Sequence, residues 1–173
     1  MRVSGLVERL AETKIGATFN QYAGSAELRR RLGDYLARRR DAPLLLVGEA
    51  AGHRGARLSG LPFTSERQLS GTGPAELTAT IVHRVLDELG LTEHVLLWNV
   101  VPTHPHLPGR VESNRRPTAP EVVAAHPFLA ELASGRRVIA VGRLAESVTG
   151  APYIRHPSHG GAEAFREGLA RLV

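Results

Sequence analysis

Three apolar runs of this sequence end in, or are followed by, side chains that can bind a polar ligand or transfer a proton. These side chains are Glu49 and His53 after residues 44–47, Asn99 near the end of residues 94–101, and His156 after residues 153–155. A carboxylate or an imidazole can act as a general base, and an amide or an imidazole can hydrogen-bond to a ligand. If the fold brings them together, they predict a binding or catalytic site for one small polar ligand.

Alternating strands and helices must position these side chains. Apolar runs predict four strands, at residues 44–47, 94–101, 137–141 and 153–155. Apolar residues spaced three or four apart predict the helices, which begin near Ser25, Pro74, Thr118, Leu144 and Ala162. This order predicts an α/β fold with three layers, α/β/α, around a four-stranded parallel sheet. Because parallel strands end at one edge of a sheet, the side chains named above are expected to surround one site.

Local features of the chain lead to further expectations. Residues 1–173 are expected to form one domain, of which residues 1–24 show no sustained periodicity and predict an N-terminal arm with at most a short helix. The glycine-rich residues 49–73 predict a long loop. Thr118 has capping-box spacing to a glutamate and predicts a helix start, and Pro127 is expected to kink or shorten that helix.

The composition limits the chemistry that the protein can perform. The chain has no cysteine, which excludes disulfides, thiolate zinc sites, cysteine-held iron–sulfur clusters and cysteine nucleophiles. No stretch is long enough to cross a membrane and no signal peptide is evident, so we expect an intracellular protein, in the bacterial cytoplasm, with no membrane partner. The 22 basic residues exceed the 17 acidic ones, and all but Lys14 are arginine, which is compatible with nucleic acid as a partner.

Short motifs in this order resemble those of a known family. The motifs are Gly48-Glu49-Ala50-Ala51-Gly52-His53, Phe63 thirteen places after Ala50, Leu96-Leu97-Trp98-Asn99-Val100-Val101-Pro102, Ser113-Asn114-Arg115-Arg116-Pro117-Thr118, and His156-Pro157-Ser158. Together they resemble the uracil-DNA glycosylase superfamily over about residues 43–169. The absence of cysteine places the resemblance in a branch without the iron–sulfur cluster. The resemblance implies a monomeric DNA-repair enzyme that hydrolyses the N-glycosidic bond of uracil or a related deaminated base in DNA.

The resemblance also implies roles for individual residues. A glycosylase extrudes its target base from the duplex into a pocket. Phe63 would stack on the flipped base, Asn99 would read its pyrimidine edge, and Gly48 and Ala50 would line the pocket. His156 would donate a hydrogen bond to the base O2 as negative charge develops there. These roles require no cofactor and no metal.

The residue that activates water is left open by the sequence. Ala50 stands where other branches of the family carry an aspartate or asparagine that positions the attacking water. Glu49 and His53 are therefore the candidates for this catalytic role. Gly52 stands where a tyrosine excludes larger bases in the best-known branch, and Gly160 stands where that branch inserts a leucine wedge into DNA. Without a wedge, flipping would favour a base that is already mispaired or single-stranded.

Contacts with the DNA backbone are expected from two loops. The loop that contains His156 supplies Ser158 and His159, and the preceding proline-rich loop supplies Asn114 and Arg115. Hydroxyl, amide, imidazole and guanidinium groups can all donate hydrogen bonds to phosphate oxygens. DNA that contains uracil or another deaminated base is thus the expected partner.

Two alternative functions are compatible with the same residues. Because Ala50 cannot activate water, the protein could be a catalytically silent member of the superfamily that binds DNA or a nucleobase. The sequence His104-Pro105-His106 also places two imidazoles on one side of an extended segment, and His159 or His53 could join them in a metal-dependent hydrolase. Analysis of the purified protein for metal would test the second alternative.

Overall fold

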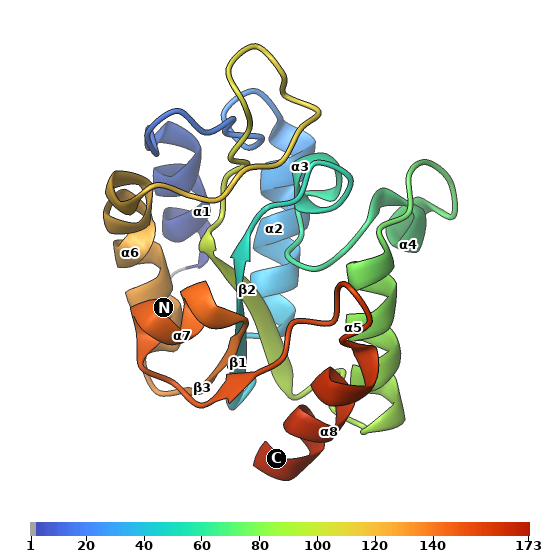
Figure 1. Ribbon diagram of the computed structural model, residues 1–173. Helices are drawn as coiled ribbons and strands as arrows, with labels where there is room; N and C mark the ends of the chain where they lie inside the picture. The colour runs from blue at the N-terminus through green and yellow to red at the C-terminus, as the bar shows by residue number, and fades with distance from the viewer. Residues whose placement is uncertain (1–2) are drawn as a thin grey trace.

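The computed structural model describes residues 3–173 and has three layers, with helices on both faces of a parallel sheet (Figure 1). The four strands are β1 (Leu44–Ala50), β2 (Val95–Val101), β3 (Arg137–Val141) and β4 (Tyr153–Ile154), arranged in the order β2-β1-β3-β4 with every pair parallel. The helices are α1 (Val3–Glu12), α2 (Ala26–Arg38), α3 (Ala56–Ser59), α4 (Glu66–Ser70), α5 (Leu77–Glu88), α6 (Ala119–Ala133), α7 (Arg143–Thr149) and α8 (Ala162–Leu172). The predicted fold class is confirmed.

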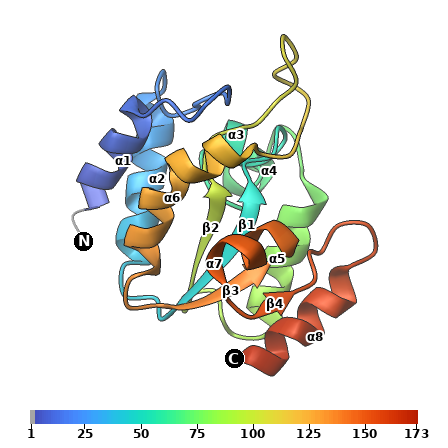
Figure 2. The ribbon, with the colours of Figure 1, turned by 60° about the vertical axis from the view of Figure 1, so that its left-hand side comes forward.

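The central strands are buried on both faces, as their continuous apolar runs predict. In β1, Leu45 and Val47 pack into the apolar cluster on one face of the sheet, whereas Leu44 and Leu46 pack into the cluster on the other. The first cluster includes side chains of α1, α2, α6 and α7, and the second includes those of α5 and α8. Figure 2 shows α6 and α7 on one side of the strands and α5 on the other.

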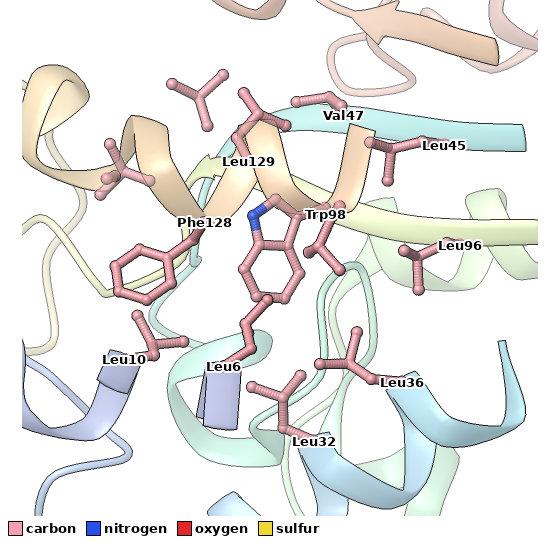
Figure 3. Packing of buried hydrophobic residues seen from close by; sticks show 14 of the residues in the cluster. Leu6, Leu10, Leu32, Leu36, Leu45, Val47, Leu96, Trp98, Phe128 and Leu129 are labelled. Carbon is pink, nitrogen blue, oxygen red and sulfur yellow. The ribbon is translucent and has the colours of Figure 1, made fainter. Parts of the chain in front are cut away.

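Trp98 of β2 lies at the centre of the first cluster and is fully buried. Figure 3 shows its indole ring between Leu6 of α1 and Leu129 of α6, with Leu32 of α2 nearby. Burial of a large aromatic side chain stabilises a fold by several kcal/mol, and its truncation to alanine typically costs about 3–5 kcal/mol. The same strand that anchors the core at Trp98 thus presents the next residue, Asn99, at the carboxyl edge of the sheet.

The N-terminal segment is more than the arm that its sequence predicts. Residues 3–12 form helix α1, and Leu6 and Leu10 on one face of this helix are completely buried. Val3, Leu6, Val7 and Leu10 do recur at helical spacing, but this period covers only ten residues and is easily overlooked. Since Tyr22 is also buried and its hydroxyl donates to the Gly60 carbonyl oxygen at 2.9 Å, this segment completes the core rather than extending from it.

Three local expectations also need correction. The segment 49–73 contains the short helices α3 and α4, and a capping box at Ser65 and Gln68 begins the second of them. Helix α5 starts after Glu76, so Pro74 lies before its first turn. Helix α6 does not end at Pro127, because the carbonyl that loses its intrahelical partner belongs to Val123, a residue that is 72% exposed and open to water.

Within residues 3–173, no helix combines the length and the apolar character needed to cross a membrane. The loops that follow the strands gather at the carboxyl edge of the sheet. In Figure 1 the yellow loop between β2 and α6 projects furthest from this edge. The candidate site lies among these loops.

Candidate functional site

A small cavity lies at the carboxyl ends of β1 and β2 and has a volume of about 80 Å³. It is lined by residues from separate segments: Glu49, Ala50, Gly52, Ala56, Phe63, Glu76, Thr78, Asn99 and His156. Typical ligand pockets measure about 300–1,000 Å³, so this cavity suits a fragment such as a single heterocyclic ring. The structure therefore brings together the aromatic ring, the amide and the imidazole that the sequence predicted to meet.

Gly48 allows this convergence because it has no side chain. It pairs with Asn99 in the register of β1 and β2. A Cβ atom at position 48 would clash with the Phe63 ring and would lie 2.8 Å from Asn99 Oδ1. Phe63 itself has a positive φ of 50°, which is costly for a residue with a side chain. The strained backbone at Phe63 and the absence of a side chain at Gly48 together allow the Phe63 ring to lie against the sheet and beside the cavity.

Hydrogen bonds orient the imidazole of His156. The backbone N–H of Ser158 donates to His156 Nδ1 at 3.2 Å, and Ser158 Oγ lies 2.8 Å from the same nitrogen. Because a backbone N–H can only donate, Nδ1 must accept, and the neutral ring carries its proton on Nε2. Burial, together with the positive charges of Arg155 and His159, lowers the pKa of His156. The ring thus presents a neutral N–H donor, and it lies 6.5 Å from the Phe63 ring, centroid to centroid.

Two carboxylates line the cavity, and the sequence predicted only one of them. Glu49 lines both the cavity and the larger cleft beside it. Glu76, which directly precedes α5, lines only the cavity, and burial raises its pKa. A Cβ atom at Gly52 would lie 2.6 Å from Glu76 Oε1, and one at Gly55 would clash with Oε2. The two glycines make room for this carboxyl, but no motif in the sequence connects them with Glu76.

His53 does not reach the cavity. Its backbone N–H donates to Asn114 Oδ1 at 3.0 Å, and Asn114 Nδ2 lies 3.1 Å from His53 Nδ1. This pair joins the loop after β1 to the loop after β2. Of the two residues considered for water activation, only Glu49 lines the cavity.

The cavity adjoins an open cleft of about 480 Å³. The cleft is lined by the residues predicted to contact DNA, Asn114, Arg115, Ser158 and His159, and by Arg143, Tyr153 and Arg155, which the sequence did not single out. It is also lined by residues 49–52 at the end of β1 and by residues 141–143 at the end of β3. β1 connects to β2 on one side of the sheet and β3 to β4 on the other, so the cleft lies at the point where the strand order reverses.

Arg115 has a structural partner at the edge of this cleft. Its guanidinium donates two hydrogen bonds to Glu121, from Nη1 to Oε2 at 2.8 Å and from Nη2 to Oε1 at 2.6 Å. Glu121 is 2% exposed and also accepts from the backbone N–H groups of Thr118 and Ala17. The Arg115 hydrogen bonds are the main reason that the pKa of Glu121 is lowered to about 2. This junction fixes the loop between β2 and α6.

The histidines considered as metal ligands are engaged elsewhere. His104 is fully buried, with Nδ1 2.7 Å from the Ala51 carbonyl oxygen and Nε2 2.8 Å from the Val111 carbonyl oxygen. Neither ring nitrogen of His104 is therefore available to a metal ion. Within the described part of the chain, no three histidine, aspartate or glutamate side chains lie close enough together to hold one. His104 instead joins the loops that follow β1 and β2.

The fold and this cavity define an α/β protein with a ligand-sized cavity at the carboxyl edge of its sheet, and comparison with known families identifies the class. The model of the uracil DNA glycosylase superfamily matches residues 36–168, so the chain belongs to that superfamily. The crystal structure of wild-type SMUG2 from Pedobacter heparinus has a similar fold, with a TM-score of 0.71 and 12% sequence identity, over 99% of this chain and 98% of that chain. No curated protein matches the sequence. The resemblance seen in the sequence motifs is confirmed at the level of the superfamily.

Proposed function

We propose that the protein is a DNA glycosylase that hydrolyses the N-glycosidic bond of uracil, or of a related deaminated base, in DNA. The observation that carries this proposal is the convergence of Phe63, Asn99 and His156 on one cavity of about 80 Å³. Membership in the uracil DNA glycosylase superfamily supports the same reaction. The cavity adjoins a cleft with several basic residues, which suits a base that enters while its strand stays outside.

Phe63 and Asn99 provide the binding energy and the selectivity. Stacking of a base on an aromatic ring contributes about 1–3 kcal/mol, which offsets part of the cost of extruding the nucleotide. The Asn99 amide can donate to uracil O4 and accept from N3–H. Cytosine presents an amino group and an unprotonated N3 at these positions and mismatches both. One amide at the end of β2 thus separates uracil from cytosine.

His156 stabilises the departing base. Cleavage of the glycosidic bond leaves negative charge on the base and positive character on the sugar. A neutral imidazole whose Nδ1 accepts from the Ser158 backbone has its Nε2–H available to donate to O2 as this charge grows. Such preorganised donors typically contribute about 2.7–4 kcal/mol to transition-state stabilisation.

We assign activation of the attacking water to Glu49. Glu49 lines both the cavity, where the base would lie, and the cleft, where the sugar and phosphates would lie. The sugar carbon that water attacks stands between these two parts. A carboxylate at this position can accept a proton from the water and stabilise the positive character of the sugar. The neighbouring Ala50 offers no polar group for this task.

The cleft supplies contacts for the strand that carries the base. Ser158 and His159 lie in the same loop as His156, and Arg143 and Arg155 bring positive charge to the cleft. These groups can bind phosphates on either side of the extruded nucleotide. The tip of this loop is Gly160, which has no side chain to insert between bases. We therefore expect faster excision from single-stranded or mispaired DNA than from a matched duplex.

An excision assay tests the proposal directly. Labelled single-stranded oligonucleotides with one uracil, hypoxanthine or xanthine are incubated with the protein and then treated with alkali, which cleaves abasic sites. Strand breaks with the parent protein and their loss with His156→Ala are expected. If the parent produces no more breaks than His156→Ala on any of the three substrates, the protein is not a glycosylase for these bases.

Ala50 favours one other candidate, a catalytically silent protein that recognises an extruded base. This candidate needs the same cavity but no activated water. It predicts that an oligonucleotide with uracil binds more tightly than the same oligonucleotide with cytosine and is recovered intact. Preferential binding without product would therefore replace the hydrolytic proposal and leave the assignment of Phe63 and Asn99 in place.

A further inference from the structure

The segment that carries Phe63 contains several buried polar side chains that do not line the cavity. Phe63 has a φ of 50°, a conformation that is costly for a residue with a side chain. Between α3 and α4, the side chains of Ser59, Thr64 and Ser65 surround it in sequence, and each of these residues is at most 4% exposed. A strained conformation persists only where the surrounding contacts hold it. The contacts of this segment therefore show what keeps the Phe63 ring beside the cavity.

Ser59 closes the segment around Phe63. Its hydroxyl donates to the Thr64 carbonyl oxygen at 2.6 Å and accepts from the Leu61 backbone N–H at 3.1 Å. The Thr64 backbone N–H also donates to the Leu61 carbonyl oxygen at 3.3 Å. One hydroxyl thus ties the backbone before Phe63 to the backbone after it. Because Ser59 is completely buried, water does not compete for these hydrogen bonds.

His83 holds the same segment from helix α5. Thr64 Oγ1 lies 3.0 Å from the Pro62 carbonyl oxygen and donates to it, because a carbonyl oxygen can only accept. The hydroxyl has a single proton, so it must accept from His83 Nε2, which lies 3.0 Å away. Burial is the main reason that the pKa of His83 is lowered, so the ring is neutral and carries its proton on Nε2. The hydrogen bonds therefore run from α5 through Thr64 to the residue that precedes Phe63.

We propose that His83 and Ser59 are positioning residues that hold Phe63 in the conformation in which its ring can stack on an extruded base. This inference rests on the proposed function, in which Phe63 is the stacking surface. Neither His83 nor Ser59 lines the cavity or the cleft, so both act through Phe63. Without their hydrogen bonds, the backbone at Phe63 is free to relax to a negative φ, and the ring moves away from Gly48 and from the cavity.

A positioning role differs measurably from a role in stability alone. A residue that only stabilises the fold should lower the free energy of unfolding and leave binding by the folded protein unchanged. A residue that positions Phe63 should weaken the part of the affinity that comes from the base. This part is given by a ratio, the dissociation constant for DNA with an abasic site divided by that for DNA with uracil. The effect on the ratio should also disappear once the Phe63 ring has been removed.

The test measures this ratio with two single-stranded oligonucleotides. One carries 2′-fluoro-2′-deoxyuridine, which resists cleavage, and the other carries a tetrahydrofuran abasic analogue at the same position. His83→Ala and Ser59→Ala each remove one donor, and His83→Gln keeps an N–H group. His94→Ala, which changes an exposed histidine before β2, is the matched control. Phe63→Ala, alone and combined with His83→Ala, completes a double-mutant cycle.

Urea denaturation monitors the folding of each variant. Ser59 is completely buried, whereas His83 is only half-buried, so the His83 variants carry the test if Ser59→Ala does not fold. We expect His83→Ala and Ser59→Ala to lower the ratio by about tenfold and to leave the affinity for the abasic oligonucleotide unchanged. His83→Gln should keep most of the ratio, and His94→Ala should keep all of it.

The double-mutant cycle decides whether His83 acts through Phe63. We expect His83→Ala to have no further effect on the ratio when Phe63 is already alanine. The same loss with and without the Phe63 ring would overturn the proposal. An unchanged ratio in His83→Ala would also overturn it.

A crystal structure of His83→Ala without DNA tests the positioning of Phe63 independently of the proposed function. We expect a negative φ at Phe63 and a ring that no longer lies against Gly48. If the parent binds the two oligonucleotides equally, the proposed function fails, and this structure alone then decides whether His83 positions Phe63. A Phe63 backbone that keeps its positive φ in the variant would overturn the inference.

Discussion

Glu121 and Glu76 are both largely shielded from solvent, yet their pKa values are shifted in opposite directions. Glu121 accepts hydrogen bonds from Arg115 and from two backbone N–H groups, and its pKa is lowered to about 2. Glu76 faces the cavity with burial as the only influence on its pKa, which is raised. The first carboxylate holds a loop in place, and the second is left unpartnered in a cavity. A carboxylate that stabilises the fold is thus paired with a guanidinium, whereas the carboxyl in the candidate site has no hydrogen bond or charge that lowers its pKa.

The largest effect is expected in the cavity, on activity and not on folding. His156→Ala removes the donor to the base O2 and should lower the excision rate by a factor of about 100 to 1,000. The free energy of unfolding should change little, because the side chain is only half-buried in a loop. Single-turnover kinetics and chemical denaturation measure the two quantities. His126→Ala, on the exposed side of α6, is the control. An equal loss of activity in that variant would show that the loss in His156→Ala does not come from a missing hydrogen bond to the base O2.

The next largest effect is expected at the junction, on folding. Glu121→Ala leaves the Arg115 guanidinium and two backbone N–H groups without an acceptor, and we expect the free energy of unfolding to fall by about 3 kcal/mol. Urea denaturation measures this change. Glu112→Gln, an exposed carboxylate in the same loop, should have no effect. If Glu121→Ala is as stable as the parent, the junction does not anchor the loop.

The same pair should make stability depend on acid pH. The folded pKa of Glu121 is about 2, which is below its ordinary value of 4.5, so the folded state binds this proton less readily than the unfolded state. Its contribution is fully present above pH 4.5 and is lost as the pH falls toward 2. The parent should therefore lose stability over this range more steeply than Glu121→Gln. If the free energy of unfolding of the parent and of Glu121→Gln falls equally between pH 4.5 and pH 2, the loss of stability does not come from Glu121.

A smaller effect of opposite sign is expected for Glu76. Burial raises its pKa in the folded state, so ionisation of this carboxyl opposes folding above the unfolded pKa near 4.5. Glu76→Gln should thus be more stable than the parent at pH 8, by about 1 kcal/mol, and the difference should disappear as the pH falls below 4.5. Thermal unfolding at pH 8 and pH 4 measures it. A variant less stable than the parent at pH 8 would show that the carboxylate has a partner in the fold.

The sequence predicted the parts of this protein that depend on continuous patterns. Strong apolar runs located all four strands, and polar residues at their ends identified Asn99 and His156. The resemblance to the superfamily motifs identified Phe63, and all three residues line one cavity. Helix α1 was underestimated because its apolar period covers only ten residues, although Leu6 and Leu10 are completely buried. His53 has a suitable residue type and lies in the expected loop. Its imidazole, however, pairs with the Asn114 amide and does not line the cavity.

Glu76 could not be found by the same reasoning. It precedes a helix, a common position for an acidic residue, and all residues that line the cavity with it except Thr78 are more than ten positions away along the chain. Only the close approach of its carboxyl to the backbone at Gly52 and Gly55 sets it apart. Such a relation is created by folding and leaves no spacing rule in the sequence. Arg143 and Arg155 were missed for a similar reason, because arginines on a basic protein surface are common.

The most direct test of the account is a crystal structure of the protein with a single-stranded oligonucleotide that carries 2′-fluoro-2′-deoxyuridine, which resists cleavage. We predict that the uracil ring leaves the strand, stacks on Phe63, and lies within hydrogen-bond distance of the Asn99 amide and of His156 Nε2. A uracil that remains stacked in the strand, or that binds outside the cavity between β1 and β2, would contradict it.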